Sequence, residues 1–391
     1  MITLFLQYLA HSFDWKVPSF FFYSSAKMML SFITTLALTL FLGPFFIRKL
    51  YQLKIGQKIR TKEECPLLYE LHEKKKDTPT MGGVLILVSI GISLFLWMDI
   101  SHPFTFLLFL TILVLGALGG VDDYLKLKKK RSLGLKARKK MLIQTLFASF
   151  IALYLLMPGL EAQPIVKEKV NGRLITLKTT EYMERLYVPF VKNPFISFSG
   201  INKVICFFMI LFVIIGSSNA VNLTDGLDGL AAGLLILVGL VFALFAFLSS
   251  HLGLSAYLNI PYIEGAQEIA IFLAAMSGAL LGFLWYNGHP AQVFMGDTGS
   301  LALGGVIGVC SVLLRRELLL GLVGGIFVIE TLSVILQVLS YRYRQKKRIF
   351  LCTPLHHHFE YKGWPETKVV IRFWILGFLL AFLGVLSLKL Q

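Results

Sequence analysis

Long uncharged runs of apolar residues recur along the whole chain, and they constrain its fold more than any other feature. A helix that crosses a bilayer needs about 20 consecutive apolar residues. Ten runs approach or reach this length, at residues 28–47, 82–98, 104–121, 141–157, 204–218, 230–248, 269–284, 298–314, 318–340 and 373–388. The sequence therefore predicts an all-α polytopic integral membrane protein with about ten transmembrane helices, within a range of nine to eleven.

Composition supports this prediction. Hydrophobic residues make up 56% of the chain and charged residues only 15%, whereas soluble domains contain about 25% charged residues. Apart from one long loop at residues 158–203, the chain shows no change of character that would mark a domain boundary. We expect a single polytopic domain that covers residues 1–391.

The net charge is +16, from 38 Lys and Arg against 22 Asp and Glu. With ten helices, the loops at 48–81, 122–140 and 341–372 lie on one side and carry 9, 9 and 8 Lys and Arg, or 26 of the 38. The positive-inside rule places that side in the cytoplasm and both termini on the periplasmic side. The charge then marks a membrane face, and no nucleic-acid partner is needed to explain it.

The loop at 158–203 lies on the opposite, periplasmic side in this topology. Its residues 165–178 form two strand-like runs that flank Asn171 and Gly172. Asn-Gly between such runs is the strongest short-range signal for a β-hairpin. We expect a small periplasmic β-hairpin whose role is to cap the bundle.

Adjacent carboxylates, Asp122 and Asp123, follow the apolar run that ends at Val121. Such a pair at a membrane boundary can bind a divalent cation, and its like charge can raise one pKa enough for base catalysis. A solvated helix end is the alternative, and this pair alone does not decide between them.

A second polar group lies between two apolar runs. Asn222, Asp225 and Asp228 are spaced i, i+3 and i+6, which on a helical turn places all three along one face. Gly226 and Gly229 would let a phosphate approach the backbone closely. Because the loop has no basic residue, this pattern favours a binding site over a merely solvated loop.

A third polar group surrounds Asp297, which lies between Gly296 and Gly299 in a predicted tight turn. Thr298 or Ser300 is expected to cap the helix that follows. Free N–H groups at such a helix start also suit phosphate oxygens. The simpler alternative is a capped turn without a ligand.

Histidines and lysines add hydrogen-bond donors to the same predicted face. His356, His357 and His358 are consecutive, so they cannot all face one metal in regular structure, and we expect one or two of them to contact phosphate or sugar. A surface histidine run without a role is the alternative. The run at 74–76 could hold a diphosphate or could only anchor the chain at the membrane.

Two polar residues interrupt the apolar run at 318–340. Glu330 and Gln337 are seven residues apart, which is two helical turns on one face. An ionisable group inside a membrane span suggests function. We expect Gln337, nearer the cytoplasmic end, to contact a ligand, and Glu330 to pair within the bundle.

The predicted cytoplasmic face thus offers acids for Mg²⁺, glycines and basic groups for phosphate, and histidines for hydrogen bonds. Phosphoryl transfer consists largely of such positioning and charge neutralisation. The sequence therefore predicts a cytoplasmic active-site cleft where a soluble phosphate donor meets an acceptor held in the bilayer.

Five motifs in order resemble the polyprenyl-phosphate N-acetylhexosamine-1-phosphate transferases, at residues 78–83, 122–124, 222–230, 296–300 and 354–360. The resemblance implies a Mg²⁺-dependent enzyme of the bacterial inner membrane. It implies transfer of phospho-MurNAc-pentapeptide from UDP-MurNAc-pentapeptide to undecaprenyl phosphate, with release of UMP. It also implies a homodimer, which agrees with the preference of homo-oligomers for twofold symmetry.

The resemblance also assigns roles to residues. It implies Asp297 as the principal Mg²⁺ ligand with Asn222 beside it, Asp122 as the base that deprotonates the lipid phosphate, and Asp123 as its assistant. His356 joins this catalytic group, and the ring of Phe294 would stack on uracil. The implied substrate contacts are Lys75, Thr80, Lys126, Asn222, Asp225, Asp228, Asn287, Phe294, Gln337 and His357.

Two alternatives remain open. A sister transferase would use UDP-GlcNAc, but the uninterrupted histidines at 356–358 followed by Phe359 and Glu360 favour the MurNAc-pentapeptide donor. A secondary transporter would place its coupling residues near the bilayer midplane on broken helices. The acids of this chain are instead predicted at helix ends on one side.

Overall fold

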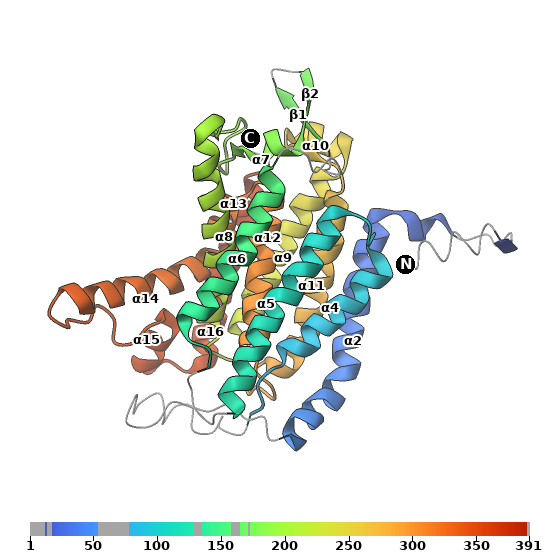
Figure 1. Ribbon diagram of the computed structural model, residues 1–391. Coiled ribbons are helices and arrows are strands. Elements are labelled where there is room, and N and C mark those ends of the chain that lie inside the picture. Colours follow the sequence, from blue (N-terminus) through green and yellow to red (C-terminus); the bar gives the residue numbers. More distant parts are fainter. Residues whose placement is uncertain are drawn as a thin grey trace.

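The computed structural model describes residues 12–13, 18–53, 78–128, 134–157, 165–170 and 173–388. Within these ranges, nine helices are long and apolar enough to cross a membrane, and α4 (Gly83–Trp97) is a shorter apolar helix. Each of the ten predicted runs overlaps such a helix, so the prediction of a polytopic helical membrane protein is confirmed (Figure 1). The nine are α2 (Ser24–Gln52), α5 (Pro103–Lys128), α6 (Ala137–Leu156), α8 (Lys203–Thr224), α9 (Leu230–Ser249), α11 (Ala266–Asn287), α12 (Gly296–Leu313), α14 (Gly325–Tyr343) and α16 (Glu366–Leu386).

Helices α11 and α12 form the centre of the bundle. Their apolar windows are 83% and 89% buried, whereas the window of α2 is 28% buried. Helix α11 packs against α2 and α9, and α12 packs against α5 and α8. The contact between α5 and α12 depends on Gly119, where a Cβ would lie 2.1 Å from the carbonyl oxygen of Asp297. Glycine at this position therefore brings the acidic ends of the two helices together.

A small antiparallel sheet lies at one end of the bundle, called here the hairpin end (Figure 1). Strand β1 (Val166–Val170) pairs with β2 (Arg173–Leu177), which confirms the predicted pair of strands, while the turn at Asn171 and Gly172 lies outside the described residues. A third strand, β5 (Tyr262–Ile263), pairs with β1 and was not predicted. The side of the membrane on which this sheet lies stays a prediction.

Short elements connect the helices. They are η1 (Ser19–Phe22), α7 (Thr179–Met183), β3 (Arg185–Leu186), β4 (Ile196–Ser197), η3 (Gly200–Asn202), α10 (Leu252–Leu258), α13 (Glu317–Val323) and α15 (Leu355–Tyr361).

The prediction of one continuous helix at 318–340 is wrong. The chain forms α13 and then α14, with a break at Gly324, and Gly325 is the first residue of α14. Adjacent glycines make a helix easier to break because glycine loses more backbone conformational entropy in a helix than other residues do. A Cβ on Gly325 would also lie 2.9 Å from Leu380 Cδ1. Figure 1 shows α14 leaning away from the bundle, with α15 near it.

Candidate active site

The end of the bundle opposite the hairpin carries a cluster of acids, and it is called here the acidic end. Helix α5 brings Asp122 and Asp123, and α12 brings Asp297, with one oxygen from each carboxylate within 4.8 Å of the others. Asp122 and Asp123 are only 0% and 3% exposed. Burying a carboxylate lowers the stability of the folded state unless the group is paired or hydrogen-bonded. The groups that contact each of these acids are therefore informative about the role of the cluster.

Two lysines bridge Asp122 and Asp297. Lys126 Nζ lies 2.8 Å from Asp122 Oδ2 and 2.9 Å from Asp297 Oδ2. Lys140 Nζ, from α6, lies 2.9 Å and 2.6 Å from the same two oxygens. Lys126 was predicted at the site, but Lys140 was not. In the sequence Lys140 is one of many basic residues in a membrane-flanking loop, and nothing distinguishes it from Lys139.

Asp123 faces the start of α12. Its Oδ2 accepts hydrogen bonds from the backbone N–H and the hydroxyl of Thr298, at 2.9 and 2.8 Å, and its Oδ1 accepts one from the N–H of Asp297 at 3.2 Å. The first N–H groups of a helix have no partner inside the helix. Asp123 therefore caps α12 from another helix, and the prediction that Thr298 or Ser300 provides the cap is wrong.

Asn222 and Asp225 approach the cluster from the end of α8. Asn222 Nδ2 donates to Asp297 Oδ1 at 2.9 Å and to Ser300 Oγ at 2.8 Å. An amide nitrogen does not ligate a cation, so Asn222 in this orientation positions Asp297. Asp225 accepts a hydrogen bond from the Gly296 N–H, and burial together with the charges of Asp297 and Asp123 raises the pKa of Asp225 to about 7.

The prediction that Asn222, Asp225 and Asp228 share one helical face is wrong. Helix α8 ends at Thr224, and Gly229 adopts a left-handed conformation with φ 77°. Asp228 consequently faces a different set of partners. Its Oδ2 accepts from the N–H of Ala291 at 3.1 Å and lies 3.0 Å from His289 Nδ1.

Asn287 is buried and holds two loops together. Its Oδ1 accepts from the Gly229 N–H at 3.0 Å, and its Nδ2 donates to the Val293 carbonyl at 2.9 Å. Both ends of its amide thus contact the backbone. The structure supports a positioning role for Asn287, and its contact with a substrate stays a prediction.

Thr80 and Phe294 lie beside the cluster. The Phe294 N–H donates to the Pro79 carbonyl, and the Gly82 N–H donates to the Phe294 carbonyl, each at 2.8 Å. This pairing places Thr80 Oγ1 next to Gly296, where an added Cβ would lie 2.8 Å from that oxygen. Lys75 lies outside the described residues.

The three consecutive histidines of α15 face three different partners. His356 Nδ1 lies 3.2 Å from Glu330 Oε2, and His357 Nδ1 lies 2.7 Å from Glu360 Oε2. His358 Nδ1 accepts a hydrogen bond from a backbone N–H at 3.1 Å. Glu330 was expected to pair within the bundle, but its partner is His356 of α15, which belongs to the loop at 341–372.

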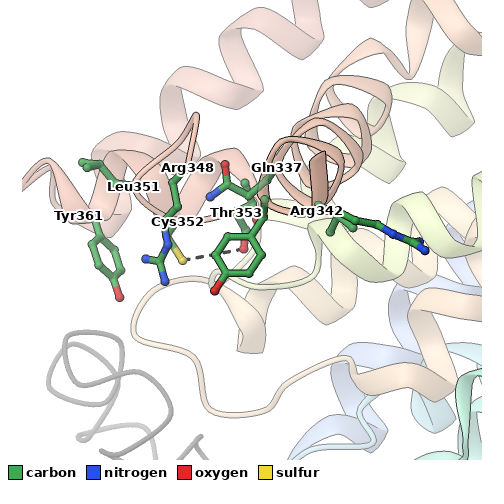
Figure 2. A pocket seen from close by; sticks show the side chains of 9 residues that line it. Gln337, Arg342, Arg348, Leu351, Cys352, Thr353 and Tyr361 are labelled. Carbon is green, nitrogen blue, oxygen red and sulfur yellow. Dashed lines mark hydrogen bonds between the residues drawn. The ribbon is translucent and has the colours of Figure 1, made fainter. Parts of the chain in front are cut away.

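Gln337 lines a pocket of about 360 Å³ between α14 and the segment that leads to α15 (Figure 2). Its Oε1 accepts from the N–H groups of Ile349 and Phe350 at 2.9 and 3.0 Å, and its Nε2 donates to the Phe350 carbonyl at 3.0 Å. Arg342 and Arg348 also line this pocket. Gln337 holds the segment in place, and its contact with a ligand stays a prediction.

The chemistry of the cluster fits Mg²⁺. Asp122, Asp123 and Asp297 offer only carboxylate oxygens, which are the ligands that hard divalent cations prefer. A second group in the described part of the chain, Asp228, His289 and Glu366, mixes oxygen with a histidine nitrogen. Since Mg²⁺ is seldom held by nitrogen, the first group is the better candidate.

A helical membrane bundle with carboxylates and lysines gathered at one end of its core defines a class of multi-pass membrane proteins with a site suited to phosphate chemistry. Comparisons with known proteins agree with this class. Residues 105–315 match the model of glycosyl transferase family 4. Residues 75–87 match the phospho-N-acetylmuramoyl-pentapeptide-transferase signature 1.

Full-length relatives make the assignment more specific. The chain is 57% identical over 413 residues to the phospho-N-acetylmuramoyl-pentapeptide-transferase of Protochlamydia amoebophila (strain UWE25), with 100% of both chains covered. Proteins of the same name from Desulfotalea psychrophila and Acinetobacter baylyi are 45% and 44% identical, with 95% and 94% of this chain and 95% of each relative covered. The chain therefore belongs to the phospho-N-acetylmuramoyl-pentapeptide-transferase family.

Proposed function

We propose that this protein transfers phospho-MurNAc-pentapeptide from UDP-MurNAc-pentapeptide to undecaprenyl phosphate. The products are UMP and lipid I, and the reaction is the first membrane step of peptidoglycan synthesis. Relatives of this name along the whole chain support the proposal. The observation that carries it is the cluster in which Lys126 and Lys140 bridge Asp122 and Asp297 at the ends of membrane-spanning helices.

In this proposal Asp297 would be the principal residue that holds Mg²⁺, with Asp122 and Asp123 close by. The ion, when bound, would neutralise charge on the diphosphate of the donor. Asn222 keeps Asp297 oriented through its hydrogen bond to Oδ1. Asp123 fixes the start of α12 and thereby the backbone that carries Asp297.

Asp122 is the proposed base for the lipid phosphate. Its Oδ1 accepts a hydrogen bond from the Leu135 N–H at 2.6 Å, which holds the carboxylate in one orientation. Lys126 and Lys140 contact its Oδ2 and supply positive charge next to the place where two phosphate groups must meet. Positive charge at this place reduces the repulsion between an anionic acceptor and an anionic donor.

The donor would lie over the turn between α8 and α9. Asp225 and Asp228 come from this turn, and Thr80 and Phe294 come from the paired segments beside Gly296. Phe294 offers an aromatic ring for the uracil base. His356, His357 and Gln337 would complete the substrate contacts from α14 and α15.

We place the acidic end in the cytoplasm of a bacterial inner membrane, with the hairpin end and both termini in the periplasm. The loops at 48–81, 122–140 and 341–372, which carry 26 of the 38 Lys and Arg, support this orientation. We also propose a homodimer. The mass of the protein in native membranes would test it, and a monomeric mass would contradict it.

The direct test is an assay of the purified protein in lipid with UDP-MurNAc-pentapeptide, undecaprenyl phosphate and Mg²⁺. We expect UMP and a lipid-linked phosphosugar in equal amounts. UDP-GlcNAc is added as a competing donor in a parallel reaction. UMP release with UDP-GlcNAc but not with the MurNAc-pentapeptide donor would contradict the proposal and favour a sister transferase.

A further inference from the structure

The ring of His356 is held on one edge only. His356 is fully buried on α15, and it donates from its backbone N–H to Glu330 Oε1 at 3.1 Å, while its Nδ1 lies 3.2 Å from Glu330 Oε2. The opposite ring nitrogen, Nε2, is also buried, and it has no hydrogen-bond partner in the part of the chain that the structure describes.

Glu330 determines which nitrogen carries the proton. Its carboxylate lies in α14, is fully buried, and can only accept hydrogen bonds. The Nδ1 of His356 must therefore be protonated to make this contact, as in histidines whose tautomer is set by a carboxylate. The remaining hydrogen-bonding capacity of the ring lies at Nε2.

Nε2 faces the turn that follows α8. A Cβ added to Gly226 would lie 2.3 Å from Nε2, so this position must be glycine to accommodate the ring. Gly226 itself is exposed and follows Asp225, which contacts the Gly296 N–H. On the side that faces this turn, Nε2 therefore meets a backbone segment that has no side chain at Gly226.

A buried polar atom without a partner is unfavourable, and in native proteins it often marks a site of function. We infer that Glu330 is a positioning residue that holds His356 so that Nε2 accepts a hydrogen bond from a hydroxyl group of the donor bound at the Asp225–Gly226 turn. This inference rests on the proposed function. It extends the site to Glu330 of α14, which does not touch the substrate itself but orients His356.

The test compares variants that separate the two edges of the ring. His356→Asn keeps a side-chain N–H that can reach Glu330 but removes Nε2, and we expect kcat/KM for the donor to fall about a hundredfold. Glu330→Gln keeps the shape but can accept only one of the two hydrogen bonds, and we expect a fall of roughly tenfold. Thr331→Val, on the same helix, is the matched control and should retain the wild-type rate.

The double variant gives the decisive comparison. If Glu330 acts through Nε2, Glu330→Gln has no further effect on turnover in the His356→Asn protein. An equal loss in both backgrounds would overturn the inference. So would a His356→Asn protein that melts at a lower temperature but retains full kcat/KM. Should His356→Asn fail to fold, Gly226→Ala blocks the same edge of the ring, and wild-type kcat/KM in that variant would overturn the inference.

The wild-type assay separates this inference from the proposed function. A wild-type protein that releases no UMP from UDP-MurNAc-pentapeptide contradicts the function, and the inference falls with it. An active wild-type protein whose variants give independent losses contradicts only the role of Glu330.

Discussion

Charged residues are buried at both ends of this bundle, but the two clusters differ in their balance of charge. At the hairpin end, Arg315 pairs with Glu317, and Arg185 pairs with Glu168. Tyr187 donates to Glu168 at 3.1 Å. Each of these two carboxylates has its own guanidinium, and the buried Arg316 lies 5.0 Å from the ring of Tyr187, so carboxylates are not in excess in this cluster. Arg315 Nε donates to the Arg185 carbonyl at 2.7 Å, which links β3 to the segment that follows α12.

At the acidic end the carboxylates outnumber the cations that contact them. Asp122, Asp123 and Asp297 gather around the ammonium groups of Lys126 and Lys140. Asp225 adds a further acid, whose pKa is raised by burial and also by the negative charges of Asp297 and Asp123. The comparison teaches that burial of charge alone does not mark a site. The unbalanced cluster is the one that can attract a divalent cation and phosphate.

The largest effect is expected from Asp297→Asn. The change removes negative charge from the unbalanced cluster but keeps the shape of the side chain, so UMP release should fall by at least about a hundredfold while the protein stays folded. Asp99→Asn, an exposed position at the hairpin end, is the matched control. Retained turnover in the Asp297 variant would end the assignment of this cluster as the active site.

Lys140→Gln should give the next largest loss. Removing this ammonium group leaves Asp122 and Asp297 with one bridging cation instead of two, and we expect kcat to fall roughly tenfold to a hundredfold. The neighbouring Lys139 is exposed, and Lys139→Gln should retain the wild-type rate. Equal rates for the two variants would show that Lys140 only adds to the positive charge of the membrane face.

The cluster at the hairpin end should respond in stability and not in catalysis. Arg315→Met leaves Glu317 buried without its partner, which costs about 3–5 kcal/mol of folding free energy. A lower melting temperature with an unchanged rate per folded molecule is the expected result. A lower rate at unchanged stability would contradict the claim that the hairpin-end cluster is structural and only the acidic end is catalytic.

The smallest expected effect is on the pH dependence of folding stability. The folded state raises the pKa of Asp225 from its usual value of about 3.9 to about 7. The folded protein therefore binds a proton that the unfolded chain releases, and stability falls as pH rises between these values. The metal-free protein should melt at a lower temperature at pH 8 than at pH 5, and Asp225→Asn should reduce the difference. The same pH dependence in both proteins would contradict this origin.

The sequence predicted the helical spans well because each span needs only a long apolar run, which is a local property. It also predicted that Asp122, Asp123 and Asp297 belong to one site, since all three lie at helix ends. Contacts between residues far apart in the chain could not be predicted from local sequence patterns. Lys140 reaches the acids from α6, and Asp123 caps α12 from α5.

Where the local patterns failed, the cause was a contact or a backbone break. The spacing of Asn222, Asp225 and Asp228 predicted one helical face, but α8 ends at Thr224. The apolar run at 318–340 predicted one helix, but the helix breaks at Gly324, and α14 leans away from the bundle. Helix periodicity gives no information about where tertiary contacts end a helix.

The most direct test of the account is the dependence of UMP release on Mg²⁺ in the wild-type protein with both substrates present. After chelation of divalent cations we expect no release, and added Mg²⁺ should restore it, because the excess of carboxylates at the acidic end needs a cation before it can accept a diphosphate. An unchanged rate in the presence of the chelator would contradict the account.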